Sequence, residues 1–196
     1  FQCKNFTVKD LGNGYSEIIC LKGTHNYNCN CKYFEGKDNN MIELNKAYCM
    51  DNLELLKQLE DESIDLIYCD ILYNTGKSFS DYDDNLGTPQ EAIEWYRPRL
   101  IEIKRVLKKT GSIFIHCDYN LSHYIKIELD KIFPIFINEI IWMYPKGIKN
   151  STRREINNHD TIFRYGKSNH YTHNSLNEPY TKEQLERYKN EDENGR

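Results

Sequence analysis

The chain has 196 residues, of which 39% are hydrophobic and 29% are charged, so it can bury one core. Its formal net charge of -4 argues against a surface that is basic throughout, although it allows local basic patches. No apolar run reaches the roughly 18 residues of a membrane-spanning helix, and the first residues lack the order of a signal peptide. Three of the seven cysteines lie in strand-like runs, where a free thiol packs as a small hydrophobic group. This pattern fits a reducing compartment better than a disulfide-bonded scaffold. We therefore expect a globular protein of the reducing cytoplasm that has no membrane partner.

The first 37 residues alternate short β-like runs with turn residues. Residues 6–8 and 15–19 flank turn residues at 10–14, a pattern that predicts a β-hairpin. We expect residues 1–37 to form a small β-rich appendage.

The same region raises the question of a metal site, because it contains Cys3, Cys20, Cys29 and Cys31, with His25 nearby. Four thiolates can bind zinc tetrahedrally and stabilise a hairpin that is too small to hold itself together. However, Cys-x-Cys spacing is less usual in zinc sites than Cys-x-x-Cys. Ordinary free thiols are the alternative, and we predict no metal.

From residue 41 to 134 the patterns of strands and helices alternate. We expect strands over residues 42–49, 64–70 and 111–117, and helices over 52–60, 89–109 and 121–133. The long helix has the clearest start, because Thr88 is a typical N-cap, Pro89 suits the first helical position and Glu91 completes a capping box. A bend is expected at Pro98. The alternation predicts an α/β fold with a mixed, mainly parallel sheet.

Two more strands are expected at residues 138–144 and 161–165, and the polar tail is predicted to carry a short helix near 180–189. The loop between the two strands is basic and contains Lys146, Lys149, Arg153 and Arg154. These side chains could contact DNA phosphates, which confers affinity without sequence choice. A solvated loop is the equal alternative.

The residues best suited to chemistry follow the strand at 64–70 directly, in the order Asp70-Ile71-Leu72-Tyr73. A carboxylate accepts hydrogen bonds from an amino group, and an aromatic ring at the lip of a sheet can stack on a base rotated out of a duplex. Taken alone, the acid could equally be a turn cap and the tyrosine a rim aromatic. The flanking sequence favours the functional interpretation.

That flanking sequence resembles the β-class amino-methyltransferases, which modify adenine N6 or cytosine N4 in DNA and in which the catalytic half precedes the cofactor-binding half. The resemblance covers roughly residues 41–170 and rests on segments that agree in order and spacing. These segments are Asp51-Asn52-Leu53-Glu54, Ser63 through Gly76, Asp81-Tyr82-Asp83-Asp84, Gly111 through Asp118, His123-Tyr124-Ile125-Lys126, Asn138 through Trp142, and His159-Asp160-Thr161-Ile162.

The resemblance implies a Rossmann-like fold that binds S-adenosylmethionine and methylates a flipped base in double-stranded DNA, as restriction-modification enzymes do. In the family, an acidic residue and the backbone carbonyl after it accept the two N–H groups of the base. This assigns the acceptor roles to Asp70 and Ile71, with Tyr73 stacking on the base. Asp51 and Asp70 are the expected cofactor contacts, and for Asp51 a chance placement on the surface is the equal alternative.

The chain departs from the family at Ile71-Leu72, where two prolines usually stand. Proline rings fix φ, so their replacement is expected to loosen the carbonyl geometry and puts activity in question. The acidic first residue favours adenine N6, because cytosine-N4 enzymes often begin this motif with serine. The alternatives are a cytosine-N4 methyltransferase and a catalytically impaired nucleic-acid-binding or pairing subunit. His116 and Asp118 are interpreted as structural groups at a strand end.

The family's acidic-Pro-Phe-x-Gly-x-Gly cofactor segment is not found in the sequence. We therefore expect the catalytic half of a larger enzyme, with residues 38–170 as the catalytic part and 171–196 as a polar tail or the start of a target-recognition region. The sheet is expected to lack strands between the strand before Asp51 and the strand before Asp70, which would leave an unpaired edge. A homodimer or a restriction subunit is the further partner that the resemblance allows.

Overall fold

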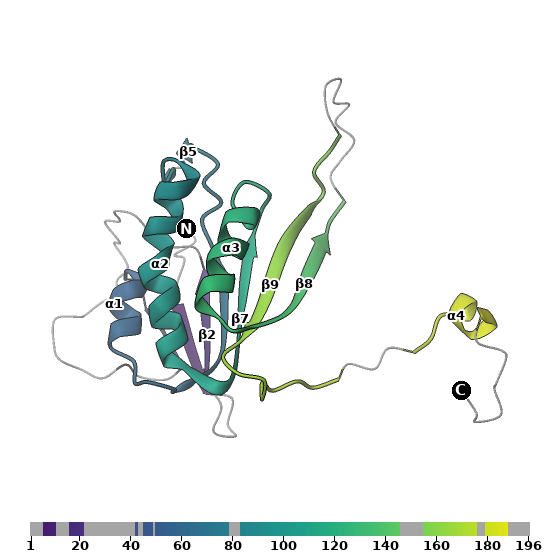
Figure 1. Cartoon of the computed structure of the whole chain (residues 1–196), viewed down its shortest axis with the longest axis horizontal. Coiled ribbons are helices and arrows are strands. Elements are labelled where there is room, and N and C mark those ends of the chain that lie inside the picture. The colour runs from purple at the N-terminus through teal and green to yellow at the C-terminus, as the bar shows by residue number, and fades with distance from the viewer. Residues whose placement is uncertain are drawn as a thin grey trace.

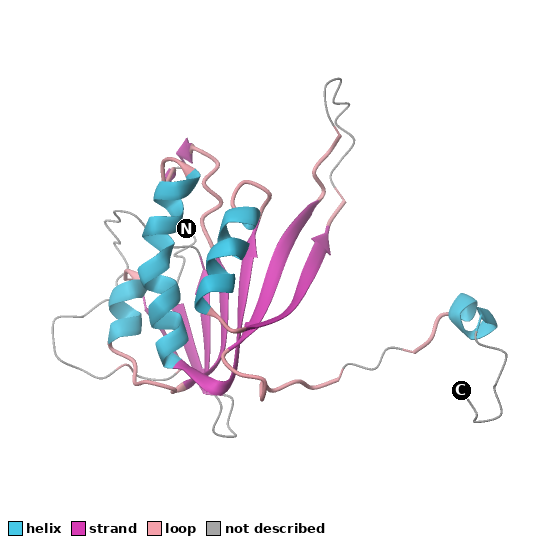
Figure 2. Cartoon of the chain, viewed as in Figure 1, coloured by secondary structure: helices cyan, strands magenta, loops and turns pink. Residues whose placement is uncertain are grey.

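A computed structural model describes residues 6–10, 16–21, 42, 45–48, 50–78, 83–145, 155–175 and 179–187. Along these ranges the elements follow one another as β1 (Phe6–Asp10), β2 (Ser16–Leu21), β3 (Lys46–Tyr48), α1 (Asn52–Lys57), β4 (Ile64–Asp70), β5 (Lys77–Ser78), β6 (Asp83–Asp84), α2 (Pro89–Val106), β7 (Leu107–Cys117), α3 (Ser122–Ile132), β8 (Ile135–Met143), β9 (His159–Gly166) and α4 (Lys182–Arg187). Figure 2 distinguishes the helices from the strands. Among the described residues, no helix combines the length and the apolar character needed to cross a membrane.

In the described part of the chain the main sheet is mixed and seven-stranded, with the strand order β3-β1-β2-β4-β7-β9-β8. Parallel pairing is confined to its centre, where β4 lies between β2 and β7, and the remaining pairings of this sheet are antiparallel. The mixed α/β architecture is therefore confirmed, with less parallel pairing than expected. Figure 1 shows α1, α2 and α3 side by side over one face of the sheet.

The core lies between these helices and that face of the sheet. Along α2 the buried apolar residues recur every three or four positions, which places them on one side of the helix: Ala92, Ile93, Tyr96, Leu100 and Ile103. The strands supply alternate residues to the same core: Ile67, Cys69, Ile113, Ile115, Phe163 and Tyr165. Burying one such aliphatic side chain contributes about 1.5–3 kcal/mol.

The N-terminal hairpin is present, but it is not the separate appendage that the sequence predicted. Its strand β2 pairs in parallel with β4, with Leu21 opposite Asp70, while β1 pairs with β3. The hairpin therefore stands between β3 and β4, where we had expected missing strands and an unpaired edge. The physical reason is that the backbone N–H and C=O groups along an uncovered β4 would lack partners, and a neighbouring strand supplies them.

The start of α2 is confirmed in detail, and its end differs from the prediction. Thr88 caps the helix, its backbone N–H donates to Glu91 Oε2 at 2.7 Å, and the backbone N–H of Glu91 donates to Thr88 Oγ1 at 3.3 Å. The helix ends at Val106 instead of Lys109, and β7 begins at once at Leu107. The backbone there pairs with β4, and this tertiary pairing overrides the helical pattern of the sequence.

The other helices and strands agree with the predictions in type and differ at their ends. The helix α1 is three residues shorter than residues 52–60, α3 falls within 121–133, and α4 falls within 180–189. Within 42–49 the described residues place the strand β3 at Lys46–Tyr48. Strands β8 and β9 are longer than predicted because they pair with each other in an antiparallel arrangement.

Candidate active site

The candidate site lies at the side of the sheet where the strands β4, β7 and β8 end, which we call the site edge. The strands β4 and β7 run in parallel and both end there, with Asp70 opposite His116 in the register. The strand β8 ends at the same edge and β9 begins there, with Trp142 opposite Asp160. In Figure 1 this is the upper edge, where the arrow of β8 points. Ligands of open α/β sheets bind outside the carboxyl ends of the strands, so the fold gathers these residues where a ligand is expected.

Tyr73 contacts Asp70 directly through a hydrogen bond. The Tyr73 hydroxyl donates to Asp70 Oδ1 at 2.9 Å, and both side chains are partly buried. Burial, and then the charge of Asp70, raise the pKa of Tyr73, so the phenol stays protonated and remains a donor. The sequence predicted that Tyr73 would act through its ring alone. The structure adds a contact that fixes the carboxylate and the ring relative to each other.

His116 lies at the centre of the site and is only 4% exposed. Its Nδ1 is 3.0 Å from the Tyr68 hydroxyl and 3.6 Å from Asp70 Oδ1. Its Nε2 is 3.4 Å from both the Tyr73 hydroxyl and Asp160 Oδ2. The sequence analysis treated His116 as a structural strand-end group. Its link to Asp160 could have been found only by predicting that β9 pairs with β7, because the two residues lie 44 positions apart.

Aromatic side chains surround this polar centre. The Trp142 ring lies 5.1 Å from the His116 ring between centroids, and the Trp142 side chain is 51% exposed. Tyr144 lies next to Trp142, with ring centroids 6.3 Å apart, and its hydroxyl donates to Asp160 Oδ1 at 3.1 Å. An exposed indole beside partly buried acids provides a flat apolar surface on which a planar group can stack. Trp142 was part of the sequence resemblance, but it had not been assigned a role.

The Ile71-Leu72 segment is held firmly without prolines. Ile71 is 6% exposed and Leu72 is 0% exposed, so both side chains are part of the core. The Ile71 backbone N–H donates to the His116 carbonyl at 3.2 Å, and the Leu72 carbonyl accepts from the Tyr96 hydroxyl at 3.1 Å. We had expected the loss of the proline rings to loosen this segment. Packing and these two hydrogen bonds fix the backbone on both sides of the Ile71 carbonyl instead.

The loop after Tyr73 is fixed by Asp84, which is 4% exposed. Its Oδ1 accepts from the Asn74 backbone N–H at 3.1 Å, and its Oδ2 accepts from the Thr75 backbone N–H at 3.1 Å and the Thr75 hydroxyl at 2.6 Å. Asn74 and Gly76 have φ values of 55° and 71°, the left-handed region that suits asparagine and glycine. The segment Asn74-Thr75-Gly76 is therefore turn structure, as its composition indicated.

Asp51 has a clear structural role in the described residues. It is the N-cap of α1, where Oδ1 accepts from the Leu53 backbone N–H at 2.8 Å, and Oδ2 pairs with Arg99 at 2.7 Å. β3 is antiparallel to β1, β1 is antiparallel to β2, and β2 is parallel to β4, so β3 runs in the same direction as β4. Asp51 follows β3 and therefore lies at the site edge. Its contact with the cofactor stays a prediction. Asp118 bonds Asn120 through both oxygens, which agrees with the structural role assigned to it.

The two remaining groups of predicted residues fall outside the part of the chain that can be described. Lys146, Lys149, Arg153 and Arg154 lie outside the described residues, as do Cys3, Cys29 and Cys31. Cys20 lies in β2, of which only the backbone is described. Within the described ranges no three side chains of the metal-binding types are grouped to hold an ion.

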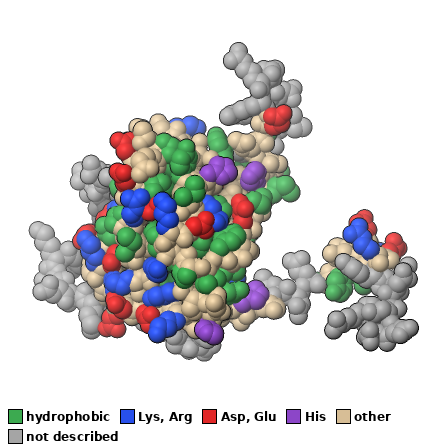
Figure 3. All heavy atoms as spheres, viewed as in Figure 1, with side chains coloured by type: hydrophobic (Ala, Val, Ile, Leu, Met, Phe, Trp, Pro, Cys, Tyr) green, Lys and Arg blue, Asp and Glu red, His purple; other side chains and the backbone are tan. Residues whose placement is uncertain are grey.

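The face covered by the helices carries side chains of both charges. Figure 3 shows Lys and Arg interspersed with Asp and Glu over this face, without one continuous basic region.

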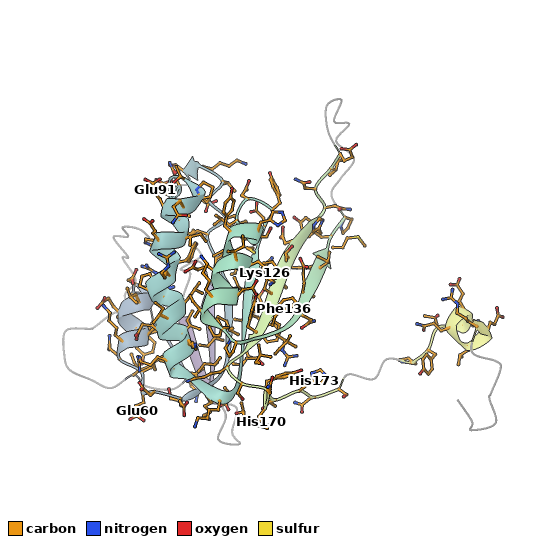
Figure 4. All side chains as sticks on the ribbon, in the orientation of Figure 1. Glu60, Glu91, Lys126, Phe136, His170 and His173 are labelled. Carbon is orange, nitrogen blue, oxygen red and sulfur yellow. The ribbon has the colours of Figure 1, made fainter. Side chains whose placement is uncertain are left out.

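In Figure 4 Glu91 marks the site edge, whereas Glu60, His170 and His173 lie toward the opposite edge. Lys126 points at Phe136, with Nζ 4.2 Å from the ring centroid, and so joins α3 to β8. Because they lie toward the opposite edge, His170 and His173 are not part of the site.

Comparisons with known proteins identify the family to which this chain belongs. Residues 64–196 match a protein family described as DNA methylase, of the N6/N4 type. The type II methyltransferase M.HpaI of Haemophilus parainfluenzae is 37% identical over 123 residues, which are 62% of this chain and 38% of the relative. The type II methyltransferase M.EcaI of Enterobacter cloacae is 34% identical over 149 residues, covering 70% of this chain and 32% of the relative.

Two further comparisons involve proteins with a named target base. The DNA adenine methyltransferase YhdJ of Escherichia coli is 36% identical over 96 residues, which are 48% of this chain and 31% of that protein. Among solved structures, the PvuII cytosine-N4-specific DNA methyltransferase gives a TM-score of 0.48 at 19% identity, with 63% of this chain and 49% of that one covered. The chain spans about a third of the length of the curated relatives it matches.

Proposed function

Because the chain belongs to the N6/N4 family of DNA methylases, we propose that it carries the base-binding part of an enzyme that methylates an exocyclic amino group in double-stranded DNA. The methyl donor is S-adenosylmethionine, and the favoured target is adenine N6 in a restriction-modification setting. One observation carries the proposal: the Asp70 carboxylate is fixed at the carboxyl edge of the sheet beside aromatic rings.

The proposed role of Asp70 follows from the chemistry of the amino group. The lone pair of an exocyclic nitrogen is delocalised into the base, so the nitrogen is a poor nucleophile until acceptors draw its N–H groups toward tetrahedral geometry. Tyr73 occupies one acceptor position on Asp70 Oδ1. A carboxylate has further lone pairs on both oxygens, so the acid can also accept from a base. The Ile71 carbonyl is the proposed second acceptor.

The aromatic residues are proposed to hold the base outside the duplex. Rotating a base out costs a few kcal/mol of lost stacking and pairing, which ring contacts in the site offset. Tyr73 is held at Asp70 by its hydroxyl, so its ring is fixed next to the proposed acceptor. Trp142, at 51% exposure, offers a second surface for a base or its neighbour.

The cofactor fits the acidic groups at this edge. S-adenosylmethionine carries a positively charged sulfonium and ribose hydroxyls, for both of which carboxylates are suitable partners. Asp51, whose side chain is 35% exposed, and Asp70 follow parallel strands and lie at the same edge. We assign the cofactor contacts of this chain to these two residues. When bound, the cofactor supplies the methyl group by direct displacement, and the protein's contribution is positioning.

Adenine is preferred over cytosine because of the acidic residue at position 70. The catalytically impaired alternative rested on Ile71-Leu72 and on the missing glycine-rich segment. The buried contacts of Ile71 and Leu72 argue against a loosened loop, which removes the first of these two grounds. We further infer phosphate contacts for the basic residues Lys146, Lys149, Arg153 and Arg154, and a cytoplasmic location, where DNA and reduced thiols are found. Association with a second copy or with a restriction subunit stays a prediction.

The test is transfer of labelled methyl groups from S-adenosylmethionine to unmethylated duplex DNA by the full-length gene product. We expect Asp70→Ala to reduce incorporation by at least about a hundredfold, the scale of losing one preorganised transition-state contact. Asp61→Ala is the matched control, because Asp61 is 75% exposed and pairs only with Arg105 in the described contacts. Incorporation that is unaffected by Asp70→Ala would show that another group handles the base.

A further inference from the structure

The imidazole of His116 lies between two carboxylates that come from different strands. Nδ1 is 3.6 Å from Asp70 Oδ1, and Nε2 is 3.4 Å from Asp160 Oδ2. The side chain is 5% exposed, so water screens these contacts only weakly. An imidazolium formed at this position would carry its charge between two negative groups. His116 is thus placed to receive a proton from one carboxylate while the other stabilises the product.

We propose that His116, held by Asp160, takes up the proton that methyl transfer releases to Asp70; this inference rests on the methyl transfer proposed above. The amino nitrogen forms a bond to the methyl carbon while the carbon–sulfur bond breaks, and its electron pair stays on sulfur as a neutral thioether. The nitrogen becomes positively charged and gives one proton to the Asp70 carboxylate. That proton passes to Nδ1 of His116 once the Tyr68 hydroxyl rotates its hydrogen away from the Nδ1 lone pair, and the imidazolium later releases the proton to water.

The other groups that face His116 fit this role. From β4, Tyr68 approaches Nδ1 at 3.0 Å, and burial raises the pKa of its hydroxyl to about 12. Tyr73 likewise has a raised pKa because of burial and Asp70, so both phenols stay protonated and do not compete as bases. From β8, the Trp142 ring contributes apolar surface and no charge. Asp70 and Asp160 are therefore the two carboxylates that face His116 in the described part of the chain.

In the neutral imidazole, one nitrogen donates and the other accepts. Donation from Nε2 to Asp160 leaves Nδ1 as the acceptor that faces Asp70 and Tyr68. Asp160 is itself held by the Tyr144 hydroxyl at 3.1 Å. Asp160 is therefore a positioning residue that selects the tautomer, and His116 acts through Asp70 without contacting the base.

The proposal predicts a specific pH dependence. His116 must be neutral to accept a proton, so the rate of methyl transfer should rise with pH as the imidazole loses its proton. Replacing His116 removes this rise. Replacing Asp160 by asparagine removes the charge that stabilises the imidazolium, so the rise should move to lower pH. A purely structural role would lower the rate equally at every pH.

The experiment measures single-turnover methyl transfer by the full-length gene product from pH 5 to 9, in wild type, His116→Gln, Asp160→Asn and the exposed control His123→Gln. We expect His116→Gln to lose about a hundredfold at its best pH, within the usual range for a positioned proton acceptor, and to lose the pH-dependent rise. The control should follow the wild type. Melting curves report whether each variant folds, and Asp160→Asn still tests the idea if His116→Gln does not.

Three results separate the two proposals. A His116→Gln variant that keeps the wild-type rise with pH overturns the proton route, as does an Asp160→Asn profile that does not shift. If the wild type transfers methyl and Asp70→Ala does not, the proposed function stands even when the proton route falls. If the wild type transfers no methyl at any pH, the proposed function falls together with this inference.

Discussion

At the scale of residues, Tyr73 shows how a site can be partly predictable. The order of an acid and an aromatic after a strand makes Asp70 and Tyr73 candidates from local sequence alone. The hydroxyl contact between them, at 2.9 Å, depends on the path of the backbone from residue 70 to residue 73, which the sequence pattern does not specify. His116 and Asp160 could not be paired from sequence, because their contact depends on the antiparallel register of β7 and β9. Local chemistry was therefore predictable, and chemistry assembled across strands was not.

Removing only the hydroxyl of Tyr73 should slow methyl transfer. In Tyr73→Phe the ring remains for stacking, but Asp70 loses a charge-assisted hydrogen bond, a type of contact worth roughly 1.5–3 kcal/mol. We expect single-turnover transfer to be about tenfold slower than in the wild type, the loss that corresponds to the lower end of that range. Titration of duplex DNA should give an affinity within about twofold of the wild type. Tyr119→Phe is the control, since Tyr119 is 51% exposed. Equal rates in both variants would contradict the role of the hydroxyl.

At the scale of elements, the start of α2 was predictable to the residue and its end was not. The capping box is a contact within four residues, so Thr88 and Glu91 determine it by themselves. The end of the helix depends on β4, because β7 takes up its pairing at Leu107 as soon as the chain returns to the sheet. The same reason explains why β8 and β9 are longer than the strands predicted from the sequence. Boundaries set by neighbouring strands are not encoded locally.

The capping box gives a prediction for stability and its pH dependence. Thr88→Ala should lower the free energy of unfolding by about 1 kcal/mol, as measured by urea denaturation. Hydrogen bonds from the Thr88 backbone and side chain lower the pKa of Glu91 in the folded protein. The stability contributed by Glu91 is therefore present above its unfolded pKa and is lost as the pH falls through the folded value. A Thr88→Ala effect that is unchanged between neutral and acidic pH would contradict this coupling.

At the scale of the whole molecule, the sheet brings the candidate site together at one edge, while the described helices α1–α3 cover one face. The α/β class was predictable from the alternation of strand and helix patterns. The position of the N-terminal hairpin between β3 and β4 was not, because Cys20 and its neighbours carry no sequence signal for pairing with β4. Long-range strand order follows from which backbone edges need partners, and a sequence pattern does not specify it.

DNA binding by the whole protein should depend on salt through the basic loop. Replacing Lys146, Lys149, Arg153 and Arg154 by glutamine should weaken binding to all duplex sequences about equally. Each phosphate contact that is lost should reduce the slope of log affinity against log salt by roughly one. Filter binding at several salt concentrations measures both quantities. A loss confined to one DNA sequence would instead indicate base contacts.

The most direct test of the account is the chemical identity of the methylated nucleoside. DNA from cells that express the full-length gene product is digested to nucleosides and analysed by mass spectrometry, with Asp70→Ala as the paired variant. The account predicts N6-methyladenine in the wild-type sample and none above background with Asp70→Ala. N4-methylcytosine would contradict the choice of base, and methylation that persists in Asp70→Ala would contradict the site itself.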